Sequence, residues 1–329
     1  MNNTLLARLT GRHEFYLGIL VLLLAIGLTL STDEFMSLGN LTDVATSYAI
    51  LGILACGLFV VLIAGGIDIS FPAMTAIAQY VMASWVIGHG GNFALAFALA
   101  MLVGLLLGLV NGFLVYWLRV PAIIITIATL NLYYGLLVYA TNGTWLYGFP
   151  DWFMDGVNWF TFTAADGYDY GLTLPLLSLA GVILFTAVLM NRTRLGRQIY
   201  AMGGNRDAAS RLGLNLRRLH FYVYGYMGAL AGIAAVVQAQ ITQSVAPNSL
   251  LGFELTVLAA VVLGGTSMTG GRGSLTGTLL GVVLLAFLQN GLTLLGVSSY
   301  WHTVFSGAII LVSISATAWN EKRKLAREL

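Results

Sequence analysis

The sequence predicts an all-α protein, a polytopic bundle of transmembrane helices, and two observations support this fold class. Of its 329 residues, 58% are hydrophobic and only 9% are charged, whereas an average soluble domain has about 25% charged residues. Apolar runs also recur along the chain at the length of about 20 residues that a helix needs to cross a bilayer. Too few polar side chains remain to cover a water-facing surface. We therefore expect one transmembrane domain over residues 1–329.

About ten spans are expected from the apolar runs and from the residues that interrupt them. They cover about 14–31, 42–64, 70–88, 93–118, 121–142, 172–190, 219–241, 253–267, 274–297 and 301–318. The eighth run is short, so we expect a broken or re-entrant helix there. The first run follows Arg8 and Arg12 but has no small-x-small cleavage site after it. We interpret it as a retained helix rather than a signal peptide.

The basic residues predict the orientation of the chain. With ten spans, all 15 lysines and arginines fall on one side of the membrane. They occur at Arg8, Arg12, Arg119 and Arg272, in the loop of about 191–218, and in the tail of about 319–329. The opposite side carries acidic residues and no basic ones. The positive-inside rule makes the basic side cytoplasmic, so we expect both termini, including a short N-terminal segment of about 1–13, in the cytoplasm.

A short capped helix is expected within the basic loop. Gly203-Gly204 is interpreted as a break, Asn205 suits a helix N-cap, and Gly213 suits a left-handed C-terminal position. A helix of about two turns, from Arg206 to Leu212, is too short to be stable alone in water, so it must dock on something. Two interpretations stay open: a groove in a cytoplasmic partner, or anionic lipid headgroups. The candidate docking residues are Gly204, Asn205, Ala208, Ala209, Leu212 and Gly213.

Two glycine-rich segments are similar: GGIDIS at 65–70 and GGTSMTGGRG at 264–273 both follow an apolar run and precede a span. A charge such as Asp68 costs about 3 kcal/mol or more at the bilayer centre. Either Asp68 and Ser70 cap the third span near the cytoplasmic surface, or the segment is a hinge beside a translocation path. The hinge or gate candidates are Gly65, Gly66, Asp68, Ser70, Gly264 and Gly265. GGRG lacks the GK[ST] of a phosphate loop, so close helix approach explains these glycines better.

Uncharged polar side chains also recur inside the spans. They form hydrogen bonds between helices, or some of them line a path for a neutral, hydroxyl-rich solute, because amides both donate and accept. The candidates for a solute path are Gln79, Asn111, Asn131, Gln238 and Gln289. The outer loop 143–171 is aromatic and acidic. Such a composition is typical of the interfacial aromatic belt and also of a docking surface for an external partner.

Other residues disfavour several functions. The only lysines, Lys322 and Lys324, lie in the tail, and no Gly-Lys pair occurs, so we expect no nucleotide hydrolysis by this chain. No catalytic arrangement, metal site or cofactor site is expected, since the histidines are far apart in the sequence. The net charge of +2 gives no reason to expect nucleic-acid binding. Only Asp68 and Glu254 come close to being intramembrane carboxylates, which argues against ion coupling.

Four segments in the same order resemble the ribose-type ABC importer permeases, in the branch that handles simple sugars and autoinducer-2. They are GGIDIS, VNGFLVYWLRVPAIIITIATL at 110–130, GRQIYAMGGNRDAASRLGLN at 196–215 and LGGTSMTGGRGSLTGTLLG at 263–281. The resemblance implies a permease of the bacterial inner membrane that imports a monosaccharide or a similar neutral solute. It also implies that residues 204–213 match the motif through which the family couples to its ATPase.

The resemblance further implies the partners. These are a second permease chain, identical or a sister, two cytoplasmic ATP-binding subunits, and a periplasmic solute-binding protein. An autoinducer-2 uptake permease is the alternative within this family. Two other classes also stay open. A secondary carrier would take up solute with an ion gradient and no ATPase, and a channel or membrane scaffold would act without ATP.

Overall fold

The computed structural model describes residues 13–163 and 169–298, together with 300–302, 304–305, 307–308 and 311. Within this part of the chain, seven helices are long and apolar enough to cross a membrane, and a bent pair of helices adds an eighth. Helices dominate the fold, as the apolar runs predict. The expected cytoplasmic segments at the two termini and most of the tenth expected span, 301–318, lie outside the described residues.

The long helices follow the expected runs closely. They are α2 (His13–Ser31), α5 (Phe71–His89), α6 (Phe93–Leu118), α7 (Ala122–Thr141), α9 (Leu174–Arg192), α12 (Leu216–Thr242) and α14 (Leu275–Leu294). The run 42–64, expected to be one helix, is a pair, α3 (Leu38–Ser47) and α4 (Ala49–Ile63), bent by 44°. The short eighth run forms a short helix, α13 (Phe253–Leu263).

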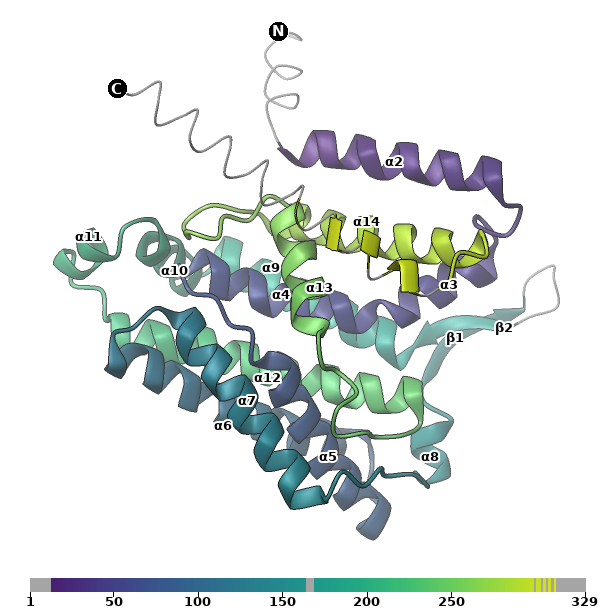
Figure 1. Cartoon of the computed structure of the whole chain (residues 1–329), viewed down its shortest axis with the longest axis horizontal. Coiled ribbons are helices and arrows are strands. Elements are labelled where there is room, and N and C mark those ends of the chain that lie inside the picture. Colours follow the sequence, from purple (N-terminus) through teal and green to yellow (C-terminus); the bar gives the residue numbers. More distant parts are fainter. Residues whose placement is uncertain are drawn as a thin grey trace, which may run out of the picture.

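Helix α4 lies at the centre of the bundle. Every one of its residues is buried, and its sequence AILGILACGLFVVLI has no polar face, which is the pattern of a core helix. It contacts α9, α10, α12, α13 and α14, and Figure 1 shows it running between α14 and α12. Helix α2 differs, because it packs along α14 and leaves most of its apolar side chains exposed. Such a surface fits a helix that faces lipid.

Helices α6 and α12 pack backbone against backbone through small residues. We call this contact the glycine seam; it consists of Gly104, Gly108 and Gly112 of α6 with Gly228 and Gly232 of α12. A Cβ atom added at Gly108 would lie 3.0 Å from the Cα atom of Gly228, and one at Gly104 would collide with the Gly228 carbonyl oxygen. Small residues four apart permit such close crossings of membrane helices. In the sequence these glycines have the G-x-x-x-G spacing of closely packed membrane helices, as GLLLG at 104–108 and GALAG at 228–232, and this signal was missed.

The outer loop contains structure that the sequence did not predict. It includes α8 (Asp151–Met154) and an antiparallel hairpin of β1 (Asn158–Thr163) and β2 (Asp169–Thr173). The expectation of an all-α fold is therefore wrong for this short hairpin, which sits apart from the helical bundle in Figure 1. The aromatic residues divide into two groups: Phe149 and Phe153 are buried and stack at 4.4 Å, whereas Trp145 and Tyr147 are exposed.

Candidate functional site

The described arginines gather at one end of the bundle, which we call the basic end. They are Arg119, Arg192, Arg194, Arg197, Arg206, Arg211, Arg217, Arg218 and Arg272. They belong to the α6–α7 turn, the end of α9, the helices α10 (Arg194–Gly204) and α11 (Arg206–Arg211), the start of α12, and the α13–α14 loop. In Figure 1, α10 and α11 lie at the left end of the molecule and the hairpin lies at the right end. This grouping agrees with the one-sided distribution expected from the sequence.

Helices α10 and α11 are fixed at their N-termini by side-chain caps. The Thr193 hydroxyl accepts a hydrogen bond from the Gly196 N–H at 3.0 Å, and Asn205 Oδ1 accepts one from the Ala208 N–H at 2.9 Å. The predicted Asn205 cap and the predicted positive φ of Gly213, 80°, are both confirmed. The prediction that Gly203-Gly204 breaks the chain is wrong, because both residues are helical and end α10. The break occurs at Asn205, whose backbone is extended.

The apolar face expected on α11 is divided between two sides. Ala209 is buried against the protein, whereas Ala208 is exposed and Leu212 exposes 79% of its surface. The helix also ends at Arg211, so Leu212 lies one residue beyond it. The inward side holds α11 on the protein. The outward side presents a leucine in an arginine-rich surface, where it is available to another molecule.

Three glycine segments that are far apart in the sequence meet at the basic end. We call this contact the glycine junction; it consists of Gly65, Gly203, Gly204, Gly270 and Gly271. A Cβ atom added at Gly270 would lie 2.7 Å from Gly65 Cα and 2.8 Å from the Gly203 carbonyl oxygen. One added at Gly271 would lie 2.5 Å from Gly204 Cα. The segments therefore touch through their backbones, with no room for a side chain at Gly203, Gly270 or Gly271.

The glycine junction is tied directly to the core helix. The Gly271 N–H donates a hydrogen bond of 2.9 Å to the carbonyl oxygen of Ile63, the last residue of α4. A Cβ atom at Gly203 would collide with the same oxygen. Gly65, Gly270 and Gly271 have φ angles of 82°, 94° and 68°, a region that residues with a Cβ rarely adopt. The end of α10 thus contacts both the end of α4 and the α13–α14 loop.

The hinge candidates divide between this junction and other contacts. Gly65 joins the junction, and Gly66 lies under the hydroxyl of Tyr224. Gly264 ends α13 and packs against Gly277 of α14, while Gly265 lies against the ring of His13. In the second glycine-rich segment, it is therefore Gly270 that meets Gly65 of the first segment, while Gly271 meets Gly204 of α10. The repeated Gly-Gly pair in both segments was the signal that could have identified them.

A chain of buried hydrogen bonds begins beside the junction; we call Asp68, Ser70, Asn111 and Tyr133 the polar chain. Asp68 Oδ1 accepts hydrogen bonds from the Ser70 N–H at 2.8 Å and the Ser70 hydroxyl at 2.7 Å. The Ser70 Oγ accepts one from Asn111 Nδ2 at 2.6 Å, and the Tyr133 hydroxyl donates to Asn111 Oδ1 at 3.3 Å. The polar chain thereby connects the start of α5 with α6 and α7.

Asp68 occupies the N-terminus of α5 as a buried carboxyl group. The Ser70 side chain makes no cap bond of its own, so Asp68 supplies the acceptor at the start of the helix and Ser70 passes the contact on to Asn111. Burial raises the pKa of Asp68 to about 6, and the hydrogen bonds from Ser70 and Asn111 oppose this rise. Asp68 Oδ2 has no hydrogen-bond partner among the described residues.

The candidates for a solute path are spread over several helices. Asn111 belongs to the polar chain, Gln79 is buried on α5, and Gln289 of α14 accepts a hydrogen bond from Tyr48 at 3.0 Å. Gln238 is half-buried on α12. Asn131 is exposed on α7 and donates to the Ile127 carbonyl of its own helix. Asn111 is hydrogen-bonded to a hinge candidate, Ser70.

Comparison with known proteins identifies the family. Residues 40–314 match the model of the family described as branched-chain amino acid transport system / permease component. The chain is 36% identical over 297 residues to the ribose import permease protein RbsC of Escherichia coli, with 90% of each chain covered. It is 35% identical over 299 residues to RbsC of Bacillus subtilis, covering 91% of this chain and 90% of the relative.

A third relative is named for the import of autoinducer 2 rather than ribose. The chain is 32% identical over 295 residues to the autoinducer 2 import system permease protein LsrC of Yersinia enterocolitica, covering 90% of this chain and 79% of that one. No solved structure matches the chain. The family model, over residues 40–314, spans the long helices from α5 to α14, the glycine junction and the capped α10–α11 segment described above. The chain belongs to the family of branched-chain amino acid transport system / permease components, and it is a membrane permease.

Proposed function

We propose that this chain is the transmembrane permease subunit of a bacterial ABC importer that carries a monosaccharide or similar neutral hydroxylated solute across the inner membrane. The family description names branched-chain amino acids, but the relatives described above carry the names of ribose and autoinducer 2 import proteins. A D-allose transport system permease protein of Escherichia coli is also 30% identical over 297 residues. These relatives favour a sugar over an amino acid.

The observation that carries this proposal is the direct backbone contact between α10 and the core. An ATP-binding subunit that grips α11 through the exposed Leu212 would move α10 with it. Because the end of α10 meets Gly65 and the Ile63 carbonyl through atoms that have no room to slide past each other, the displacement reaches α4 and the segment 64–70. Asp68 and the polar chain then connect that segment with α6 and α7.

In this proposal, transport is driven by ATP hydrolysis on separate ATP-binding subunits. A ligand shifts a two-state equilibrium only through its different affinity for the two states, so ATP-bound and nucleotide-free subunits must grip α11 differently. We place two such subunits at the basic end, in the cytoplasm, together with both termini of a ten-span domain. A second permease chain, identical or a sister, forms the path with this one. A periplasmic solute-binding protein docks at the opposite end, where Trp145 and Tyr147 are exposed.

Reconstitution tests this function. The chain is placed in liposomes with the ATP-binding and solute-binding subunits of its own transporter, and uptake of radiolabelled ribose and other pentoses and hexoses is measured with and without ATP. We expect uptake that requires all the subunits and ATP. Uptake by the chain alone, driven by an ion gradient, would instead indicate a secondary carrier. Downhill passage without ATP would indicate a channel.

A substitution tests the coupling residues in the same assay. Ala208→Trp places a large ring on the exposed side of α11, whose inward side is left intact. We expect ATP-driven uptake to be abolished while the permease still assembles in the membrane. Gly181→Trp on the exposed surface of α9, where an added Cβ atom meets nothing within 4 Å, serves as a control for added bulk. Full uptake by the Ala208 variant would show that α11 is not the coupling helix.

A further inference from the structure

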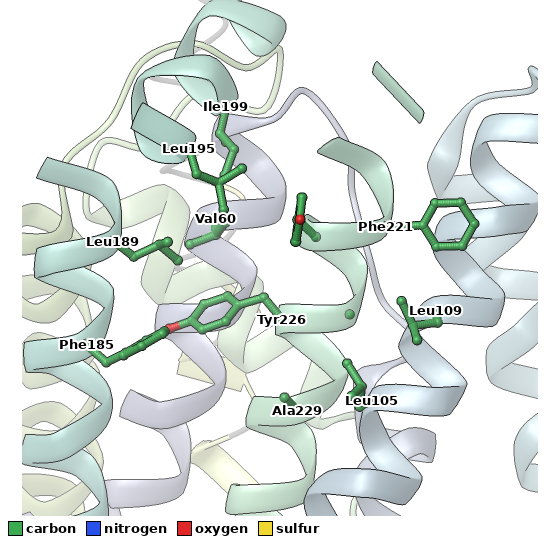
Figure 2. A pocket seen from close by; sticks show the side chains of 12 residues that line it. Val60, Leu105, Leu109, Phe185, Leu189, Leu195, Ile199, Phe221, Tyr226 and Ala229 are labelled. Atoms are coloured by element: carbon green, nitrogen blue, oxygen red, sulfur yellow. The ribbon is translucent and has the colours of Figure 1, made fainter. Parts of the chain in front are cut away.

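An apolar cavity of about 400 Å³ opens between helices near the basic end. Figure 2 shows Phe185 and Leu189 of α9 on one side and Leu105 and Leu109 of α6 on the other, with Leu195 and Ile199 of α10 above them. The remaining lining residues are Val60, Phe221, Tyr222, Gly225, Tyr226 and Ala229. The cavity has the size of a small-molecule site.

The lining offers almost nothing that could orient a polar ligand. The Tyr226 hydroxyl already pairs with the Thr186 hydroxyl at 2.6 Å, and its ring stacks on Phe185 at 6.0 Å. At the mouth, Phe185 and Tyr222 expose 59% and 57% of their surfaces, and the neighbouring Leu184 exposes 68%. In a membrane protein such apolar surface faces lipid tails. The cavity is therefore open to the acyl-chain region of the bilayer.

A second cavity, of about 470 Å³, adjoins the first and has a more polar lining. It shares Phe221 and Tyr222 with the apolar cavity, and its other lining residues are Asn215, Arg217 and Arg218. Arg217 lies over the ring of Phe221, 5.8 Å from the ring centroid. Both arginines are exposed and belong to the first turn of α12. A pair of positive charges thus lies directly beside an apolar groove.

We propose that the two cavities together bind one anionic phospholipid. Arg217 and Arg218 hold the headgroup phosphate, and one acyl chain lies between α6, α9 and α12. Basic pockets between transmembrane helices are a known form of anionic headgroup site. The exposed Arg194 and Arg197 of α10 alternate with the lining residues Leu195 and Ile199 and add positive charge nearby.

The positive charge at the mouth of the cavity favours an anionic phospholipid over a second copy of the chain. A copy related by a two-fold axis would bring its own Arg217 and Arg218 against the same arginines, and like charges at such close range are unfavourable. The lipid also has a structural consequence. Leu195 and Ile199 are on α10, which ends in the glycine junction, so an acyl chain packed under them supports the helix that is proposed to carry the motion.

Native mass spectrometry of the full chain, released from detergent, tests this site. Phosphatidylglycerol and phosphatidylethanolamine with identical acyl chains are added in equal amounts. The lipid that remains bound is identified from the mass that it adds to the protein. Wild type is expected to retain phosphatidylglycerol in preference. Near a charged membrane surface each basic residue contributes about a fivefold preference, so Arg217→Gln/Arg218→Gln is expected to lower that preference roughly 30-fold.

Two further variants distinguish binding of the lipid headgroup by the arginines from binding of the acyl chain in the apolar groove. Arg119→Gln/Arg272→Gln removes two exposed arginines of the basic end outside both cavities, and it should leave the preference unchanged. Ala229→Phe fills the apolar groove and should lower the retention of both lipids. No preference in wild type, or an unchanged preference after loss of Arg217 and Arg218, would overturn the proposal. So would retention of phosphate ions without lipid, or an Ala229 variant that keeps its lipid but no longer dimerises.

Discussion

The glycine seam and the glycine junction both bring backbones into contact, yet they differ in almost every other respect. In the seam, Gly104 and Gly108 are interior residues of one straight helix and meet a second helix over several turns. In the junction, Gly65, Gly270 and Gly271 lie in loops with positive φ angles and join three separate segments. The seam repeats one contact along two helices, whereas the junction concentrates a few contacts at a single point.

This difference separates a structural contact from a transmitting one. Moving α6 against α12 would break several backbone contacts at once, so the seam holds the two helices as one rigid body. The junction sits where short segments 64–70 and 264–274 connect longer helices. In the function proposed above, it shifts as a unit with these segments. We therefore expect changes in the seam to affect folding, and changes in the junction to affect transport.

The largest effect is expected from bulk in the seam. Gly108→Leu places a branched side chain where a Cβ atom alone would lie 3.0 Å from Gly228 Cα. Because two backbones must separate to admit it, we expect a loss of about 3 kcal/mol or more of unfolding free energy. The only cysteine, Cys56, is fully buried, so reaction of purified protein with a thiol-specific fluorophore during heating reports unfolding. Gly135→Leu on α7, where a side chain meets nothing within 4 Å, should unfold like wild type.

The buried carboxyl group beside the junction gives the next largest effect. Burial raises the pKa of Asp68 from 3.8 to about 6, so the folded protein binds this proton more tightly than the unfolded chain does. Protonation of Asp68 therefore contributes its full share to the free energy of unfolding below pH 3.8. This contribution falls as the pH rises to about 6, and it is lost above that pH. A shift of about two units corresponds to roughly 3 kcal/mol.

Asp68→Asn isolates this contribution. The amide oxygen can still accept from Ser70, but it carries no charge, so we expect the variant to unfold at higher denaturant concentration than wild type at pH 7.5. The gap should close towards pH 4.5, as followed by helical circular dichroism in detergent. A variant that is less stable than wild type at pH 7.5 would show that the ionised carboxylate is itself needed. That result would place a bound cation or water beside Asp68 Oδ2.

The sequence predicted the elements of this molecule better than their contacts. Long apolar runs mark helices because a bilayer requires them, and the caps at Asn205 and Gly213 are local features that adjacent residues determine. The bend at Tyr48 and the hairpin of β1 and β2 were missed. Apolar composition does not distinguish one straight helix from two bent ones, and a loop rich in aromatic residues has no strict alternation.

The candidate site was predicted only in part, for a related reason. Glycines were noticed where they occur in pairs, and such pairs do mark all three segments of the junction. Which pair meets which depends on tertiary packing: Gly270 meets Gly65 and Gly271 meets Gly204, while Gly264 packs on α14 instead. The polar chain could not be assembled from the sequence either, because Asp68, Asn111 and Tyr133 lie on elements more than twenty residues apart.

A single methyl group in the junction tests its proposed role. In Gly203→Ala the added Cβ atom collides with the Ile63 carbonyl oxygen, so α10 must move away from α4. We expect ATP-driven uptake in the reconstituted transporter to fall about tenfold, while the thermal midpoint from Cys56 labelling falls far less than in Gly108→Leu. Gly181→Ala, with nothing within 4 Å, is the matched control. Equal losses of stability in the seam and junction variants would erase the distinction between the two regions.

The smallest effect is expected from the cap of α11. Asn205→Ala removes the acceptor for the Ala208 N–H, and loss of an N-cap costs about 1 kcal/mol. Since α11 has only six residues, that loss is concentrated in one short helix. It should raise the rate of amide hydrogen exchange over 206–211 about fivefold and leave the exchange rates of α10 unchanged.

Uptake should fall only modestly, because a bound ATPase refolds the helix at the expense of some binding affinity. Asn205→Ser should restore both exchange protection and uptake, since serine is an equally good cap. Fast amide exchange that extended into α10 would mean that the two helices unfold together. The Asn205 cap would then also stabilise the glycine junction.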